Sequence, residues 1–289
     1  MTDYCWSVPR SLSVPGSLVN EDALAVSGSS LVMIDGASGL GAGRMTGWPS
    51  DPHWFAHSLA PLLVERLADG RPVAVVLAAC LAELRAEYGE GDDGGLGPSA
   101  SVLVARITGA EVEVYSLGDC LALVGLTDGS VHAVRDGAVG ELDAVVVERL
   151  QELRRGTALT PADARPLVQD LLVGNRRLRN TPEGYWIADL SGAGAPHALR
   201  RTYAASELLD VALMTDGFAA ALDLAAVVAT PETFLQDLRL HGPGPTMDAL
   251  VARLAADADC TRFPRLKPMD DSSVVVAALH AGSGLQRQC

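Results

Sequence analysis

Two segments of the sequence run from an apolar strand directly into an Asp-Gly pair. They are LVMIDG, which ends at Asp35-Gly36, and DVALMTDG, which ends at Asp216-Gly217. A carboxylate at the end of a buried strand is costly unless an opposite charge or hydrogen bonds compensate for it. The other Asp-Gly pairs of the chain lie in polar stretches, where the pair is typical of a turn. We therefore expect the fold to place a group that compensates the negative charge next to each of the two strand-end pairs.

Two further carboxylate pairs stand at strand ends. Glu21-Asp22 comes just before the strand ALAV, and Asp270-Asp271 comes just before SSVVVAAL. If the four strand ends converge, their acids must be neutralised together. Oxygen-only ligands are typical of Mg²⁺ and Mn²⁺, and two such ions sharing a carboxylate can hold a water and a phosphoryl group. The alternative is four unrelated strand caps and turns.

Apolar alternation, helical periodicity and turn residues predict the order of elements along the chain. The predicted strands are two within 22–35, then 100–107, 111–118, 120–126, 184–190, 197–203, 209–215 and 272–279. The predicted helices lie between Ser50 and Gly70 and at 72–88, 139–155, 161–174, 219–229, 231–239 and 246–257. No repeat or linker divides the chain, so we expect a single domain over residues 1–289. Such a mixture allows two packed sheets flanked by helices.

Composition narrows the class of protein. The chain is 48% hydrophobic and 20% charged, which is typical of a globular protein. Its formal net charge of −14 argues against a nucleic-acid partner, which needs a basic face, and suits a site that collects cations. No apolar run reaches the ~18 residues of a membrane span, and MTDYCWSVPR lacks the order of a signal peptide. These features predict no membrane association and a cytoplasmic location.

The acidic motifs, taken in order, resemble those of a known family. The chain reads N-E-D-A from Asn20, D-G-x-x-G from Asp35, G-D-C around Asp119, M-T-D-G at Asp216 and D-D-S-S-V-V-V from Asp270. This series is similar to that of the metal-dependent Ser/Thr protein phosphatases, the PPM or type 2C family, in its bacterial branch. The resemblance covers about residues 20–279.

The resemblance implies a fold and an activity. The fold would be α+β, a four-layer α/β-β/α sandwich of two mainly antiparallel sheets flanked by helices. The activity would be that of a metal-dependent phosphomonoester hydrolase, most often a protein serine/threonine phosphatase. Its cofactors would be two Mn²⁺ or Mg²⁺ ions that activate a water for attack on phosphorus, and its partner would be a phosphorylated protein.

The resemblance also implies roles for individual residues. Asp35 would bridge both ions, Gly36 would offer its carbonyl to one of them, and Asp216 and Asp270 would complete the catalytic carboxylates. Asp119 matches the acid that some members use for a third ion. The implied metal-binding set is Glu21, Asp22, Asp35, Gly36, Asp119, Asp216 and Asp270, in which the first two act mainly through water.

Three positions depart from the family pattern. Ala37 stands where eukaryotic members have a His, which bacterial members also lack. Ser17 stands where many members have an Arg that holds the substrate phosphate. Ala220 stands where an acid completes the third metal site, so that site lacks one of its ligands here.

Replacement cations are available for the missing Arg. Arg176, Arg177 and Arg179 form a dense basic cluster, and Arg10 precedes the first acidic motif. The cluster falls in a variable flap insertion that the resemblance places at about 156–183. Arg binds phosphate in a bidentate manner, so these residues are candidate substrate-binding groups. The alternative for the cluster is a solvated helix end.

Two other functions fit the same residues. The altered phosphate-binding position and the unusual flap allow a phosphatase of the same fold that acts on a small phosphorylated metabolite. A catalytically silent regulatory module is the other alternative, against which the retention of all principal acids argues.

Overall fold

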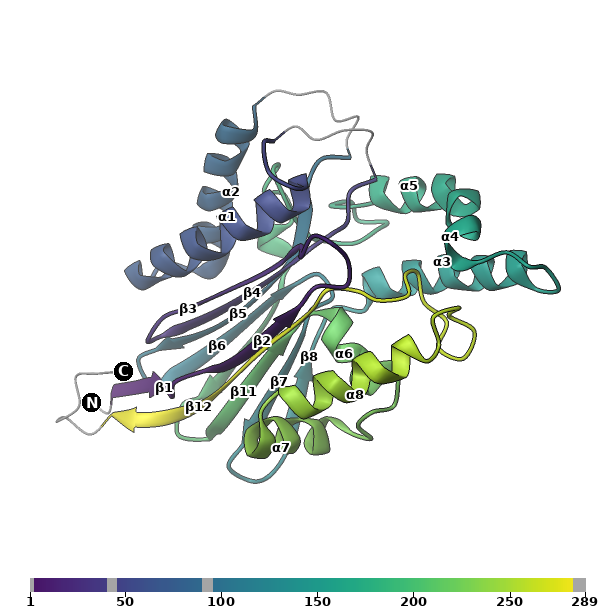
Figure 1. Cartoon of the computed structure of the whole chain (residues 1–289). Coiled ribbons are helices and arrows are strands. Elements are labelled where there is room, and N and C mark those ends of the chain that lie inside the picture. The colour runs from purple at the N-terminus through teal and green to yellow at the C-terminus, as the bar shows by residue number, and fades with distance from the viewer. Residues whose placement is uncertain (1–2, 41–45, 90–95, 283–289) are drawn as a thin grey trace.

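The chain forms two antiparallel sheets that pack face to face between two layers of helices (Figure 1). The computed structural model describes residues 3–40, 46–89 and 96–282. The first sheet, sheet I, has the strand order β10-β6-β5-β4-β3, with β9 paired to β5. Its strands are β3 (Asp22–Val26), β4 (Ser30–Gly36), β5 (Ser99–Thr108), β6 (Glu111–Leu117), β9 (Ala188–Asp189) and β10 (Leu199–Ala204).

The second sheet, sheet II, joins the two ends of the described chain. Its order is β1-β12-β11-β7-β8, with β2 also paired to β12. Its strands are β1 (Asp3–Trp6), β2 (Arg10–Val14), β7 (Leu121–Leu126), β8 (Val131–Val134), β11 (Leu208–Met214) and β12 (Ser272–Gly282). Strand β12 thus pairs with three strands, two of which come from the first 14 residues.

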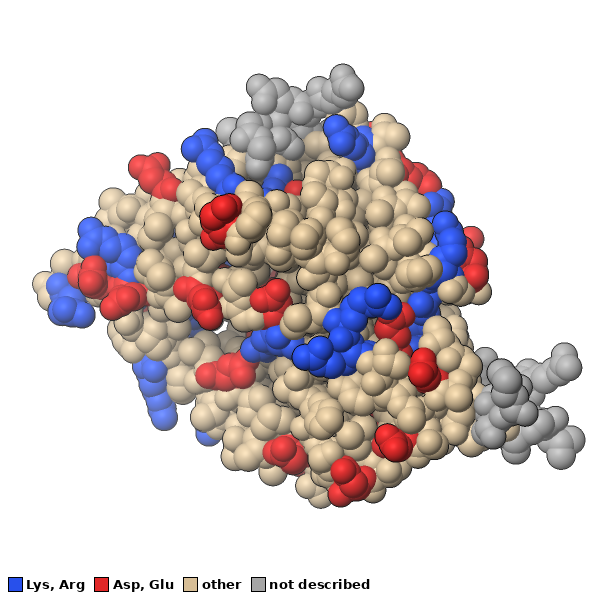
Figure 2. All heavy atoms as spheres, turned by 180° about the vertical axis from the view of Figure 1, so that it is seen from behind, with Lys and Arg blue, Asp and Glu red and all other residues tan. Residues whose placement is uncertain are grey.

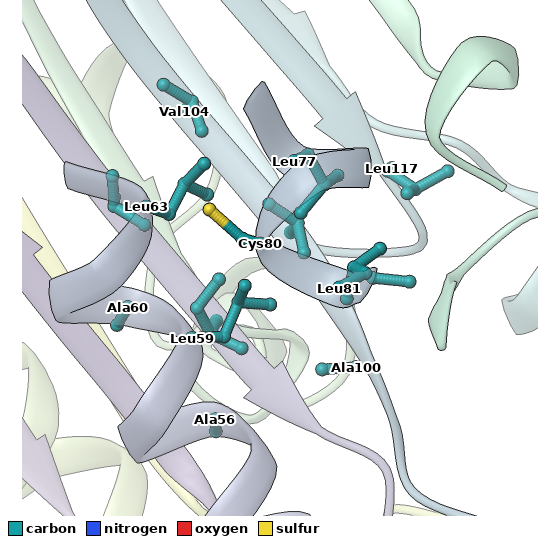
Figure 3. Packing of buried hydrophobic residues seen from close by; sticks show 14 of the residues in the cluster. Ala56, Leu59, Ala60, Leu63, Leu77, Cys80, Leu81, Ala100, Val104 and Leu117 are labelled. Carbon is teal, nitrogen blue, oxygen red and sulfur yellow. The ribbon is translucent and has the colours of Figure 1, made fainter. Parts of the chain in front are cut away.

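Helices cover the outer face of each sheet. Helices α1 (Asp51–Arg66) and α2 (Val73–Tyr88), joined by a 3₁₀ turn at Leu67–Asp69, pack on sheet I. Figure 3 shows Leu63 of α1 and Leu77 and Cys80 of α2 gathered over Val104 of β5. Helices α6 (Asp216–Asp223), α7 (Pro231–His241) and α8 (Gly244–Ala255) pack on sheet II. The expected four-layer α+β sandwich is confirmed.

Strand β4 shows how sequence alternation builds these layers. Leu31 and Met33 lie in the core between the sheets, whereas Val32 and Ile34 pack on α1 and α2. Successive side chains of a strand point to opposite faces, so Asp35 has the same parity as Leu31 and Met33. The segment SLVMI is therefore apolar on both faces because both faces of the strand are buried. The Asp35 carboxylate lies at the end of the layer between the sheets.

The flap lies between β8 and β9. It contains α3 (Ala138–Arg154), α4 (Pro161–Ala164), a 3₁₀ segment (Arg165–Val168) and α5 (Gln169–Arg177), which stand beside the sandwich in Figure 1. These helices share a small core of Val146, Leu150, Ala164, Val168 and Leu172, packed against Leu40 and Leu266. Helix α3 is thus part of the same unit as the segment predicted at 156–183.

Most predicted elements are present, and the differences have local causes. Strands β1 and β8 were not foreseen, because short strands carry little periodic signal. Strand β2 begins within SVPRSL, which is strand-like in the sequence. The segment predicted as a strand at 184–190 contains only the two residues of β9. The helix predicted at 219–229 instead runs over Asp216–Asp223, and Ala226 then takes a left-handed conformation with φ 47°. Arg253 binds the carbonyls of Ala225 and Ala226 and holds this turn.

Charged side chains on the face seen from behind are interspersed. Figure 2 shows acidic and basic residues side by side there rather than one field of either sign. None of the helices within the described ranges combines the length and the apolar character of a membrane span.

Candidate metal centre

Strand register brings the first two acids together. Asp22 of β3 is the direct antiparallel partner of Asp35 of β4, and Asp35 is in turn paired with Ser101 of β5. Directly opposed residues of neighbouring strands have Cβ atoms about 5 Å apart. Gly36 continues the strand, and a Cβ at this position would stand 2.5 Å from the Glu21 carbonyl oxygen. Only glycine therefore allows the Glu21 backbone to pass this close to β4.

Asp119 is held beside these acids by Ser101. The Ser101 hydroxyl donates to Asp119 Oδ1 (2.6 Å), and the Asp119 backbone N–H donates back to it (3.2 Å). The preceding Gly118 has φ 88°, and a Cβ there would lie 2.3 Å from Ser101 Oγ. The glycine in the G-D-C motif is thus required both by backbone conformation and by space.

The acids of sheet II reach the same edge through Thr215. The Thr215 hydroxyl donates to Asp22 Oδ2 (3.1 Å) and accepts the Ser273 N–H (3.0 Å), so it links β11, β12 and β3. Helix α6 begins at the next residue, Asp216. Gly217 passes so close to β12 that a Cβ would stand 2.0 Å from the Asp271 carbonyl oxygen. This contact fixes Asp216 next to the Asp270-Asp271 pair.

Asp271 and Glu21 are engaged by other groups of the protein. Asp271 accepts the backbone N–H groups of Gly16 (2.7 Å) and Glu21 (2.7 Å) and so ties the first acidic motif to the last. The Glu21 carboxylate accepts the hydroxyls of Ser38 (2.8 Å) and Ser50 (2.7 Å). These hydrogen bonds agree with a role for Glu21 that is less direct than that of Asp35.

Asp35 and Asp216 have no such partners. No hydrogen bond or ion pair from any described residue reaches either carboxylate, and Oδ1 of the buried Asp22 has no partner within the described ranges. Asp35 is partly exposed and Asp216 is exposed, and both line a cavity. Neighbouring acids without partners repel one another, so these oxygens suit a cationic ligand that the polypeptide does not supply.

The electrostatics of the cluster lead to the same conclusion. Burial raises the pKa of Asp35 well above its ordinary value, and the charges of Asp216 and Asp22 raise it further. Burial likewise raises the pKa of Asp216, helped by Asp119 and Asp270. For Asp22, burial raises the pKa to about 7 despite hydrogen bonds that oppose the shift. A cation would remove this mutual repulsion.

The donor set fits a hard divalent cation. All ligand candidates are carboxylate or carbonyl oxygens, which Mg²⁺ and Mn²⁺ accept. Among residues 3–40, 46–89 and 96–282, no three His, Cys, Asp or Glu side chains are already gathered closely enough to hold a metal ion. Asp119 and Asp270 are engaged by Ser101 and Lys267, respectively, so ion binding requires these contacts to adjust.

A cavity of about 140 Å³ opens beside the acids, between the sandwich and the flap. Asp35, Asp119, Asp216 and Asp270 line one side of it. Arg176 of α5 lines the other side, where its Nη2 donates to the Ser38 carbonyl (3.0 Å) and its Nη1 is buried without a partner among the described residues. The cavity therefore combines a carboxylate wall with an unsatisfied guanidinium.

The other predicted cations lie elsewhere. Arg10 donates to the carbonyls of Leu238 (3.0 Å) and Arg239 at the end of α7, so the prediction that it reaches the site is corrected. Arg179 is bound to the Gly97 carbonyl (2.6 Å) and to Asp189.

Arg177 is exposed and does not line the cavity. Adjacent helix positions point about 100° apart, which separates Arg177 from Arg176.

Sequence reasoning missed Lys267. Its Nζ contacts Asp270 Oδ1 (2.6 Å) and Ser38 Oγ (3.0 Å) and lines the same cavity. The signal was present, because Lys267 is the only lysine among the 22 Lys and Arg residues of the chain.

Comparison with known proteins adds to this geometry. The sequence matches the family model described as protein phosphatase 2C over residues 15–255. No curated protein matches the sequence at a significant level.

Several solved structures share the fold. The catalytic domain of the serine/threonine protein phosphatase PstP, in complex with two manganese ions, aligns with a TM-score of 0.53 at 17% identity, over 96% of this chain and 99% of that one. Serine/threonine phosphatase Stp1 from Staphylococcus aureus aligns with a TM-score of 0.53 at 12% identity, over 94% of each chain. The Ser-Thr phosphatase MsPP from Mycobacterium smegmatis, in complex with cacodylate, gives 0.52 at 15% identity, over 94% and 98%.

Proposed function

Because this chain belongs to the protein phosphatase 2C family, we propose that it hydrolyses phosphate monoesters and that its substrates are phosphoserine and phosphothreonine side chains of proteins. The observation that carries the proposal is that Asp35 and Asp216, which have no partner among the described residues, line one cavity together with Arg176. The two Mn²⁺ ions reported for PstP support the choice of metal.

The residues divide the work of holding two Mn²⁺ or Mg²⁺ ions. Asp35 would bridge them, with the Gly36 carbonyl, Asp216 and Asp270 as further ligands. Glu21 and Asp22, already hydrogen-bonded within the protein, would act through water. When bound, the ions would supply Lewis acidity toward the phosphoryl group and lower the pKa of a water nucleophile.

The polypeptide itself would position the substrate and protect the site. Arg176 lines the cavity and would offer its guanidinium to a phosphoryl oxygen, and the contact of its Nη2 with the Ser38 carbonyl holds the side chain in place. The flap core contributes Leu40, Leu172 and Leu266 to the cavity lining and would form an apolar wall beside the substrate. The hydroxyls of Ser38 and Ser101 line the cavity, but each already donates to a carboxylate of the protein, that of Glu21 and that of Asp119, respectively. The proposal therefore assigns the attack on phosphorus to water rather than to a side chain.

The decisive experiment is hydrolysis by the full chain of p-nitrophenyl phosphate and of phosphoserine and phosphothreonine peptides, with Mn²⁺, with Mg²⁺ and with chelator. We expect metal-dependent turnover of both substrate types and its loss in Asp216→Asn. Asp223→Asn, on the outer end of the same helix, is the matched control and should retain activity. Turnover of small phosphate esters without any phosphopeptide would contradict the protein-phosphatase assignment. Absence of all turnover in the metal-loaded protein would indicate a silent module.

A further inference from the structure

Lys267 is the single ammonium group that the side chains of this protein provide. Every other Lys or Arg position is arginine, and this one lysine lies in the candidate active site. An ammonium is a compact charge with three donors, whereas a guanidinium is a planar fork. Because the one lysine of the chain lies in this site, we considered which groups its Nζ contacts.

The loop that carries Lys267 is firmly held. It follows α8, and its anchor is the buried Asp257, which accepts the backbone N–H groups of Arg262 (2.9 Å) and Phe263 (2.9 Å). Arg265 donates to Asp257 Oδ2 (2.7 Å) and to the Leu254 carbonyl (3.0 Å). Lys267 therefore emerges from a fixed backbone, two residues after a guanidinium that is fully engaged.

The Nζ of Lys267 retains one unused donor. Of its three N–H groups, one meets Asp270 Oδ1 and a second meets Ser38 Oγ. No other described residue accepts the third. The side chain is 32% exposed, and it lines the cavity, so the free donor is accessible from the cavity side.

Ser38 joins Lys267 to the flap. Its hydroxyl accepts from Lys267, and its carbonyl accepts from Arg176 Nη2 (3.0 Å). Arg176 then has a buried Nη1 without a described partner. Two cations, one from the flap and one from the loop before Asp270, thus contact the same residue and line the same cavity, and each has a donor without a partner among the described residues.

Ser17 carries no positive charge, and Lys267 and Arg176 can supply the charge that the family places at this position. The family resemblance places a phosphate-binding Arg at position 17, but Ser17 is exposed and its hydroxyl donates to the Val19 carbonyl (3.1 Å). Arg10, the nearest upstream cation, is bound to the end of α7.

We propose that Lys267 and Arg176 together bind the phosphoryl group of the substrate, a dianionic phosphate monoester, with Ser38 setting their separation. This inference rests on the proposed function of the site. It assigns to Lys267 direct contact with the substrate, beyond neutralisation of Asp270. A lysine that served only as a counter-ion would be insensitive to added phosphate.

The single lysine allows a test that needs no turnover. Amines are labelled by reductive methylation of the full chain in chelator and in Mn²⁺, with and without inorganic phosphate, and each site is quantified by mass spectrometry. The α-amino group is the internal control. We expect phosphate to slow labelling of Lys267 at least several-fold without changing the control, and we expect this protection to disappear in Arg176→Met. Equal labelling of Lys267 with and without phosphate overturns the proposal, even if the enzyme is active. An inactive enzyme whose Lys267 is still protected would instead refute the proposed function alone.

Kinetics of Lys267→Met and Lys267→Arg give a second, independent reading. Loss of one charge-assisted hydrogen bond is expected to raise KM and the inhibition constant of inorganic phosphate about 10- to 150-fold. Lys267→Arg keeps the charge and should recover part of the loss. Arg262→Met, an exposed cation of the same loop, is the matched control. Calorimetry with Mn²⁺ alone separates a loss of metal from a loss of phosphate. Unchanged KM and phosphate inhibition in Lys267→Met would refute direct contact.

Discussion

Asp35 and Asp257 are two carboxylates withdrawn from solvent, and the protein treats them in opposite ways. Asp257 accepts three backbone N–H groups, from Thr261, Arg262 and Phe263, and pairs with Arg265. Asp35 receives nothing from any described residue. Burial opposes ionisation of Asp257, but the hydrogen bonds and Arg265 outweigh it and hold its pKa below the ordinary value, whereas that of Asp35 is raised.

The difference separates an acid with a structural role from one for which we propose a functional role. Asp257 has its compensation inside the fold and serves to fix the loop before β12. Asp35 lacks such compensation, so its carboxylate contributes an unfavourable free energy to the metal-free fold. Uncompensated charges of this kind are typical of sites that bind a ligand.

The largest expected effect comes from neutralising Asp35, the acid proposed to bind metal. Asp35→Asn should reduce phosphatase activity more than about 100-fold, because loss of a metal ligand exceeds the effect of losing its supporting contacts. The metal-free variant should melt at or above the wild-type temperature, since like-charge repulsion is relieved. Calorimetric melting and Mn²⁺-dependent hydrolysis measure both effects. Full turnover would remove Asp35 from the metal site.

Neutralising the structural acid should have the reverse outcome. Asp257→Ala leaves Arg265 and three N–H groups without their partner, and both side chains of the pair are less than a tenth exposed. We expect a loss of about 3–5 kcal/mol in the free energy of unfolding, measured by urea denaturation. Asp259→Ala, an exposed acid in the same loop, is the control. A loss below about 1 kcal/mol would show that the anchor contributes little.

Metal should increase the difference between the two regions, because the proposed function has it bind only the region of Asp35. At about 100 times its dissociation constant, Mn²⁺ should stabilise the wild-type fold by about 2.7 kcal/mol. Asp257→Ala should gain a similar increment from its lower baseline, whereas Asp35→Asn should gain much less. Thermal melts with Mn²⁺ and with chelator decide this. A wild-type melting temperature indifferent to both would contradict a metal centre.

The smallest effect is that of pH on the metal-free protein. Asp22 has a pKa of about 7 when folded against an ordinary 3.8, so the folded state binds more protons between these values. The free energy of unfolding should therefore fall as pH rises from about 4 to 7, by at most about 1.4 kcal/mol per unit and group.

The pH dependence that Asp257 contributes to the free energy of unfolding has the opposite sign. Its lowered pKa means that the unfolded chain binds more protons, so its contribution is lost as pH drops below 3.8. Urea denaturation across pH 3–8 in chelator, with Asp22→Asn and Asp257→Ala compared, tests both signs. An unchanged slope in Asp22→Asn would exclude it as the origin.

The positions of the acids in the candidate metal centre were largely predictable from sequence, because a strand has a fixed parity. The pattern SLVMID places Asp35 on the same face as Leu31 and Met33, and the ordered motifs identify the remaining acids. The cations were not predictable in the same way. Which of Arg176 and Arg177 faces the cavity depends on how α5 packs against the flap core, and that packing is tertiary.

Arg10 is a second cation whose position depends on tertiary packing and was not predictable from sequence. Its place in strand β2 could be suspected, but its guanidinium is taken up by the exposed carbonyls at the end of α7, more than 220 positions away in the chain. Lys267 was missed for a different reason, since it belongs to no motif. Its uniqueness in composition was the available signal.

The central place of β12 in sheet II has a consequence for synthesis of the protein on the ribosome. Ser273 contacts Ser13 across 260 positions, and Asp270 comes into place only with this strand. While the nascent chain is still short of β12, strands β1, β2 and β11 have an unfilled neighbour, and Asp35 faces an incomplete set of acids. Contacts of such long range form late and slowly. On the proposed function, a nascent chain therefore could not assemble its metal site before β12 has left the ribosomal tunnel and paired with its neighbours.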